Sequence, residues 1–200
     1  IESFKTVDLR DDLLRYFYRQ TVLQQYNASL SGGSDKKAWL FSLGFDKYVG
    51  GMVGQRGQKI TSNLQHTLAL GRSMKLALLS RFTRNDVFDN SARFDYNYTP
   101  GGGRTALYPY AKLVGNDGSA LAVPNSYNIR YVEGLQDGQL LDWMYRPYAE
   151  TGLTPSDNRR NHLVSQLNWT YSPIKGLDLA VLYNNEIQNE ERNTVYKEDS

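Results

Sequence analysis

Residues 26–45 read YNASLSGGSDKKAWLFSLGF, and the alternation in this stretch decides the predicted fold. Apolar side chains occupy every second position on both sides of a predicted Gly-Gly-Ser-Asp-Lys turn: Tyr26, Ala28 and Leu30 precede it, and Trp39, Phe41, Leu43 and Phe45 follow it. A period of two on both sides of a glycine turn is typical of an antiparallel hairpin with one apolar face. That face can contact the second sheet of a soluble sandwich or the lipid of a membrane, and the hairpin alone leaves both alternatives open.

The composition excludes several classes of function. The 200 residues contain 23 Lys and Arg against 21 Asp and Glu, so no basic surface for nucleic acid is expected. Two histidines and no cysteine argue against zinc clusters, disulfide frameworks and thiol nucleophiles. The sequence has no apolar run of about 18 residues, but a strand that crosses a membrane needs only about 10 residues with every second one apolar.

The same alternation returns in four later segments, so six strands are predicted. Their apolar rows are Ile60, Leu64, Leu68 and Leu70; Met74, Leu76, Leu78 and Phe82; Leu163, Leu167, Trp169 and Tyr171; and Leu177, Leu179, Val181 and Tyr183. The fifteen tyrosines also favour a β-rich chain. Before the strands, residues 6–19 predict a short amphipathic helix with Leu9, Leu13 and Phe17 on one side.

The connections between the predicted strands alternate in length. Short turns (GGSDKK, GRS and SPIKG) follow strands one, three and five, whereas long connections follow strands two and four. This sorting is typical of outer-membrane barrels, and Trp39, Trp169 and Tyr171 lie beside the short turns, where an interfacial aromatic girdle is expected. The pattern favours an all-β fold of antiparallel strands from a large transmembrane β-barrel over a soluble sandwich. Six strands do not close a barrel, so either the long loop contains two more or the chain is part of a larger barrel.

Four segments together resemble one family, the SusC-like (SusC/RagA) TonB-dependent outer-membrane transporters of Bacteroidetes. They are QQYNASLSGGSDKKAWLFSLGF (24–45), YPYAKLVGNDGSALAV (108–123), LLDWMYRPYAETG (140–152) and NHLVSQLNWTYSPIKGLDLAVLYNNE (161–186). The resemblance covers nearly the whole chain from Val7 onward, and its specificity lies in the combination of the four segments.

The resemblance implies an importer of oligosaccharides or peptides in the bacterial outer membrane. Family members close a barrel of about 22 strands around an N-terminal plug, work beneath a SusD-like surface lipoprotein and are driven by TonB through a box near the N-terminus. The chain is then expected to be the first third of the barrel, with the plug and the TonB box outside these residues. A soluble β-sandwich that binds carbohydrate stays as the alternative from another class.

On this interpretation the chain divides into four segments. They are residues 1–20, the end of the first extracellular loop with a possible short helix; 21–87, four barrel strands; 88–158, a long extracellular loop with a small hairpin at Asn116-Asp117-Gly118; and 159–200, two barrel strands and the start of the next loop.

Motifs for catalysis, metals or cofactors are weak. The glycine-rich GGMVGQRG (50–57) lacks the Lys-Ser/Thr of a phosphate loop. Asp86, Asp89 and Asp95 do not have the spacing of a calcium loop, and neither His66 nor His162 has a neighbouring nucleophile or second histidine. We therefore expect no enzyme activity, no cofactor and no metal site.

The long loop is the segment with the residues of a binding site. Its amphipathic side chains suit stacking on sugar rings or contact with peptide groups, and the candidates for ligand or lid contact are Tyr108, Tyr110, Asp142, Trp143, Tyr145 and Arg146, with Tyr127, Tyr131 and Tyr148 nearby. Packing of the loop into a compact lobe, or contact with the lipoprotein lid, is favoured over direct substrate contact. Asp142 and Arg146 can equally form a structural ion pair.

Overall fold

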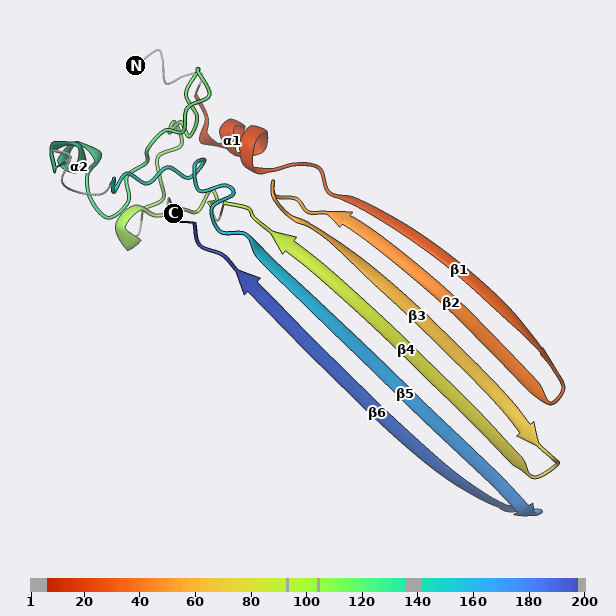
Figure 1. Cartoon of the computed structure of the whole chain (residues 1–200). Coiled ribbons are helices and arrows are strands. Elements are labelled where there is room, and N and C mark those ends of the chain that lie inside the picture. The colour runs from red at the N-terminus through yellow and green to blue at the C-terminus, as the bar shows by residue number, and fades with distance from the viewer. Residues whose placement is uncertain (1–6, 93, 104, 136–141, 198–200) are drawn as a thin grey trace.

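The computed structural model describes residues 7–92, 94–103, 105–135 and 142–197. Six strands form a single antiparallel sheet in which each strand pairs with its neighbours in sequence (Figure 1). The strands are β1 (Val22–Ser34), β2 (Lys37–Val49), β3 (Arg56–Leu70), β4 (Met74–Asp89), β5 (Ser156–Ile174) and β6 (Leu177–Thr194). The helices are short: α1 (Leu9–Asp12), the π-helix η2 (Leu13–Phe17), the 3-10 helix η3 (Pro100–Gly102) and α2 (Ile129–Leu135). The predicted all-β antiparallel fold is therefore confirmed.

The register places every predicted apolar row on the same face of the sheet. Residues directly opposite each other on paired strands share a face, and one apolar row runs Leu68, Leu76, Trp169 and Val181 from β3 to β6. A polar row crosses all six strands on the other side: Asn27, Gly44, Thr61, Thr83, His162 and Gln188. We call these the apolar face and the polar face.

The sheet is one layer thick. Among the described residues, none in the six strands is buried, and the large side chains of the apolar face are half-buried or exposed, as with Leu43 and Leu64. The part of residues 90–155 that the structure describes adds isolated bridges and no strand to this sheet. The apolar face therefore has no second sheet from the described chain against it, which is the contact that a β-sandwich requires.

Short turns and long connections lie at opposite ends of the sheet (Figure 1). Two-residue or three-residue turns join β1 to β2, β3 to β4 and β5 to β6, with the left-handed backbone at Gly71 and Gly176. Residues 50–55 and 90–155 connect the strands at the other end, where α1, η2 and α2 also lie. The predicted sorting of connections by length is present in the structure.

The first turn differs from the prediction. Gly32 and Gly33 belong to β1, where they pair with Trp39 and Ala38, so the turn consists of Asp35 and Lys36 alone. A Cβ atom on Gly32 would lie 2.9 Å from Cζ2 of Trp39. The glycine is therefore needed for the close approach of the indole ring across the strand and not for a turn conformation.

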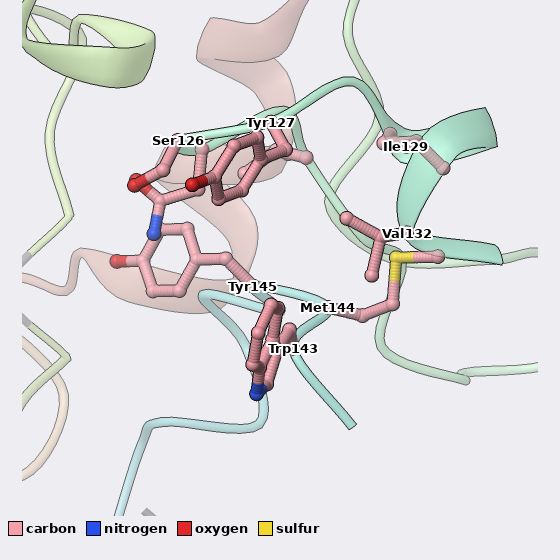
Figure 2. Close-up of a pocket in the computed structure, with 9 residues that line it drawn as sticks. Ser126, Tyr127, Ile129, Val132, Trp143, Met144 and Tyr145 are labelled. Carbon is pink, nitrogen blue, oxygen red and sulfur yellow. The ribbon is translucent and has the colours of Figure 1, made fainter. Parts of the chain in front are cut away.

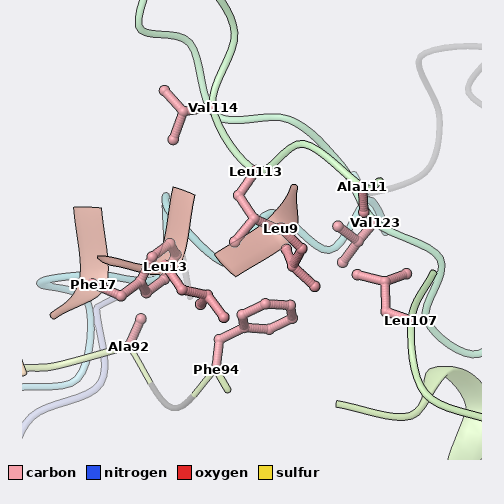
Figure 3. Packing of buried hydrophobic residues seen from close by; sticks show 10 residues of the cluster. All are labelled: Leu9, Leu13, Phe17, Ala92, Phe94, Leu107, Ala111, Leu113, Val114 and Val123. Atoms are coloured by element: carbon pink, nitrogen blue, oxygen red, sulfur yellow. The ribbon is translucent and has the colours of Figure 1, made fainter. Parts of the chain in front are cut away.

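Among the described residues, the buried core lies outside the sheet. Side chains from α1 and η2 and from residues 92–123 pack together beside the end with the long connections (Figure 3). Its members are Leu9, Leu13, Phe17, Ala92, Phe94, Leu107, Ala111, Leu113, Val114 and Val123. Leu9, Leu13 and Phe17 share a buried side, as the amphipathic pattern predicted. We call this unit, built from the described residues within 7–20 and 90–155, the lobe.

No helix among the described residues is long and apolar enough to cross a membrane.

The lobe core depends on Phe94, which is 1% exposed and has aromatic contacts with Phe17, Tyr98 and Tyr145. We expect Phe94→Ala to destabilise the lobe by about 3–5 kcal/mol, because it leaves a cavity in a packed aromatic cluster. Hydrogen exchange should show loss of protection in η2, with β2–β5 unchanged. Tyr96→Ala, in the same segment but exposed, is the control and should leave both regions protected. Equal loss in the sheet would contradict a separate lobe core.

Candidate functional site

The lobe is attached to the end of the sheet through backbone contacts made by the first residues of the described chain. The Phe17 carbonyl accepts a hydrogen bond from Val53 N at 2.8 Å, and the Gly51 carbonyl accepts one from Arg19 N at 2.9 Å. The Arg19 guanidinium donates to the carbonyls of Gly50 and Gln55. The connection between β2 and β3 is thereby held against η2, which positions the lobe on the sheet.

Contacts between distant segments also close the lobe on itself. The Asp12 carboxylate accepts a hydrogen bond from Leu113 N at 2.8 Å, and Leu9 N donates to the Pro109 carbonyl at 2.7 Å. Val114 and Ala120 form an isolated antiparallel bridge on either side of Asn116-Asp117-Gly118, the position of the predicted small hairpin. The described part of the long loop is therefore folded against α1, which contacts residues 109–113.

The lobe contains an open pocket of about 280 Å³ (Figure 2). Its lining is neutral and largely apolar or aromatic: Val123, Asn125, Ser126, Tyr127, Ile129, Val132, Trp143, Met144 and Tyr145. The backbone bond from Val123 N to the Tyr145 carbonyl, 2.9 Å long, joins its two walls. A pocket of this size and lining suits one aromatic or apolar group, with the amide and hydroxyl groups available for orientation.

The structure brings two of the six predicted contact residues to this pocket. Trp143 and Tyr145 both line it, and Trp143 stays 55% exposed. Tyr108 and Tyr110 stack on each other with ring centroids 4.8 Å apart and do not line the pocket. The predicted set is therefore divided between two places on the lobe.

The remaining two residues form the structural pair that the sequence left open. Arg146 Nη1 lies 2.5 Å from Asp142 Oδ2, one helical turn apart in sequence. Asp142 Oδ1 also accepts a hydrogen bond from Met144 N at 2.9 Å, which fixes the chain on either side of Trp143. The pair thus orients the segment that carries the pocket aromatics.

Packing accounts for part of the aromatic content, as the favoured interpretation predicted. Tyr148 contacts the rings of Tyr16 and Phe17, with centroids 5.4 and 6.2 Å away. Tyr145 is half-buried against Phe94 and Tyr98. These tyrosines connect the pocket to the lobe core, so the pocket wall is rigidly supported from behind.

The sequence interpretation missed the opposite wall of the pocket, which is built on α2. Asn128 precedes this helix, and its side chain accepts a hydrogen bond from Arg130 N at 2.9 Å. Asparagine before a helix is a recognised start signal, so the motif was available in the sequence. Ile129 and Val132 then lie on the pocket side of α2.

The protonation of Tyr145 is shifted by its surroundings. Burial raises the pKa of its phenol to about 12, and the nearby Tyr98 and Glu150 act in the same direction. The described residues also contain no group of three His, Asp or Glu side chains placed to hold a metal ion. The pocket lining is therefore neutral and aromatic at ordinary pH.

Comparison with known proteins identifies the architecture. No family model matches this chain, and no curated protein sequence matches it. A chain in the closed-closed structure of the RagAB peptide importer superimposes with a TM-score of 0.68 at 19% identity. The fold is similar to part of the RagAB importer. The alignment covers 94% of this chain and 20% of that one, and the open-open structure of RagAB gives a TM-score of 0.66 at 19% identity over 92% and 19%. The chain therefore spans about a fifth of the importer chains it matches.

The raised pKa of Tyr145 predicts a loss of lobe stability at high pH. Because the folded-state value of about 12 exceeds the ordinary value of 10.0, the stabilising contribution is complete below pH 10.0 and disappears as the pH rises through about 12. The measurement is a difference titration by ultraviolet absorbance, in which the titration of Tyr145→Phe is subtracted from that of the wild type. The difference should show one tyrosine that ionises well above the ordinary value for a phenol. A Tyr145 transition near pH 10 would contradict the assigned burial.

Proposed function

We propose that this chain forms part of the wall and one long extracellular loop of a TonB-dependent outer-membrane importer of oligosaccharides or peptides. The observation that carries the proposal is the one-layer antiparallel sheet, whose apolar face has no covering sheet among the described residues. Lipid is the solvent that such a face requires, with every strand hydrogen-bonded to a neighbour inside a closed barrel. The similarity in fold to RagAB importer chains supports the same assignment.

The direction of the chain in the membrane follows from its connections. In outer-membrane barrels short turns are periplasmic and long loops are extracellular, so the lobe is placed outside the cell. Trp39, Trp169 and Tyr171 then lie at the periplasmic interface, where the last two rings stack with centroids 5.9 Å apart. The polar face lines the lumen or contacts a plug, and the role of these residues is structural and recognitional rather than catalytic.

The lobe is proposed to contact the ligand or a SusD-like surface lipoprotein that covers the barrel. Its outward pocket, with Trp143 exposed beside it, is the surface with the aromatic character that binding sites favour. Energy coupling to TonB would belong to a plug outside these residues. A soluble carbohydrate-binding sandwich is disfavoured because the described residues provide no second sheet.

A matched pair of substitutions tests the membrane assignment. Leu64 lies on the apolar face and Gln65 on the polar face of the same strand. Leu64→Arg is expected to destabilise the folded barrel by about 2–4 kcal/mol, because a charge then faces lipid, whereas Gln65→Arg should have an effect below about 1 kcal/mol. Urea titration of the full-length protein in lipid vesicles measures both. A protein that stays monomeric without detergent and tolerates Leu64→Arg would overturn the proposal.

Trp143→Ala tests the role of the lobe. Removing the exposed indole should weaken ligand or lipoprotein binding by about fivefold or more, because exposed aromatic anchors contribute at least about 1 kcal/mol to interfaces. The barrel should stay folded, since the indole is not part of the buried core. Tyr196→Ala removes an exposed aromatic ring just after β6 and serves as the control. Unchanged uptake together with unchanged complex formation would rule this role out.

A further inference from the structure

The apolar face changes character abruptly near the lobe. The last row that is apolar on all three of the first strands is Tyr26, Phe45 and Ile60. Two residues further along the same strands and on the same face, Gln24, Lys47 and Gln58 follow in register, and the row after them is Val22, Val49 and Arg56. A step of two residues along a strand is about 7 Å. The cationic and apolar side chains are therefore separated by a distance comparable to the size of a lipid headgroup.

Two adjoining hollows occupy this boundary on the apolar face. We call the hollow nearer the lobe the upper one and the other the lower one. The lower hollow, about 370 Å³, is lined by Tyr26, Asn27, Ala28, Leu43, Gly44, Phe45 and Ile60. The small side chain of Ala28 lies between the larger Tyr26 and Leu30 of its row and leaves the depression open. The upper one, about 230 Å³, is lined by Lys47, Tyr48, Arg56, Gly57, Gln58, Asp86, Phe88 and Asp157.

Most charges around the upper hollow already have partners. Asp86 accepts hydrogen bonds from Arg84 Nε at 3.0 Å, Arg159 Nε at 3.1 Å and Gln58 Nε2 at 3.3 Å. This network fixes the far side of the hollow and neutralises its central carboxylate. The second carboxylate in the lining, Asp157, is separated from Arg56 by Phe88, which pairs with both.

Lys47 and Arg56 are different, because neither is in an ion pair within the part of the chain that the structure describes. Both side chains are exposed. The Arg56 guanidinium lies over the Phe88 ring, 4.3 Å from its centroid, which positions it at the edge of the hollow without neutralising it. Two adjacent strands thus present uncompensated cations directly above an apolar depression.

We propose that these hollows form a binding site for one anionic lipid. Its phosphate contacts Lys47 and Arg56, and an acyl chain occupies the depression at Ala28, Phe45 and Ile60. The inference rests on the proposed function, since it requires the apolar face to lie in a membrane. The combination of a cationic upper hollow and an apolar lower one distinguishes this ligand from a free anion, which would use only the first.

Native mass spectrometry of the full-length protein in detergent tests the site, with phosphatidylglycerol and phosphatidylcholine of identical acyl chains as probes. We expect retained phosphatidylglycerol adducts and few phosphatidylcholine adducts. Lys47→Gln/Arg56→Gln should weaken phosphatidylglycerol binding about tenfold or more, because two cations near an anionic headgroup are lost. Ala28→Trp fills the depression and should also weaken binding, without any change of charge.

The matched control is Lys75→Gln/Arg81→Gln, which removes two exposed cations from the polar face and should leave lipid binding unchanged. Heat-modified migration on gels verifies that every variant is folded. Equal binding by the Lys47/Arg56 variant, equal retention of both lipids, or full competition by inorganic phosphate would each overturn the proposal. Failure of the proposed function looks different, because the protein would then remain soluble without detergent and would not enter vesicles.

Discussion

The hydrogen-bond register of the six-stranded sheet is the constraint on which the rest of the structure depends. Side chains alternate between the two faces of a strand, so a shift of one residue in any pairing would move a whole apolar row to the other side. The observed register keeps all six rows together and all six polar rows opposite them. One apolar surface and one polar surface follow from that single arrangement.

The lobe complements a sheet that has no buried interior of its own. Aromatic packing around Phe94 holds α1, η2 and the long loop together, and the Arg19 contacts attach that unit to residues 50–55. The pocket beside Trp143 therefore rests on a packed core, although it belongs to a loop. A loop held in this way can present a defined surface to a ligand or a partner, which an extended connection of the same length cannot do.

The alternation of apolar residues was sufficient to predict the strands, because period two needs only local sequence. It also predicted the helical side of Leu9, Leu13 and Phe17. It did not predict the position of Gly32 within β1, because that depends on the Trp39 ring on the neighbouring strand. The pocket wall at α2 and the Lys47–Arg56 hollow were missed for a related reason: each joins residues that are distant in sequence, and only the pairing of strands and the folding of the loop bring them together.

The composition of the lobe core has a consequence for the order of folding. Phe17 lies before β1 and Phe94 lies after β4, and the two rings contact each other in the core. All of β1–β4 therefore lies in sequence between the two halves of one cluster. The two halves come together only when that long segment has returned to its starting point, and such distant contacts form slowly. Pairing of the first two hairpins shortens the separation, because it brings the start of β1 and the end of β4 to the same end of the sheet. The lobe core is therefore expected to form late in folding, after the first four strands have paired in register.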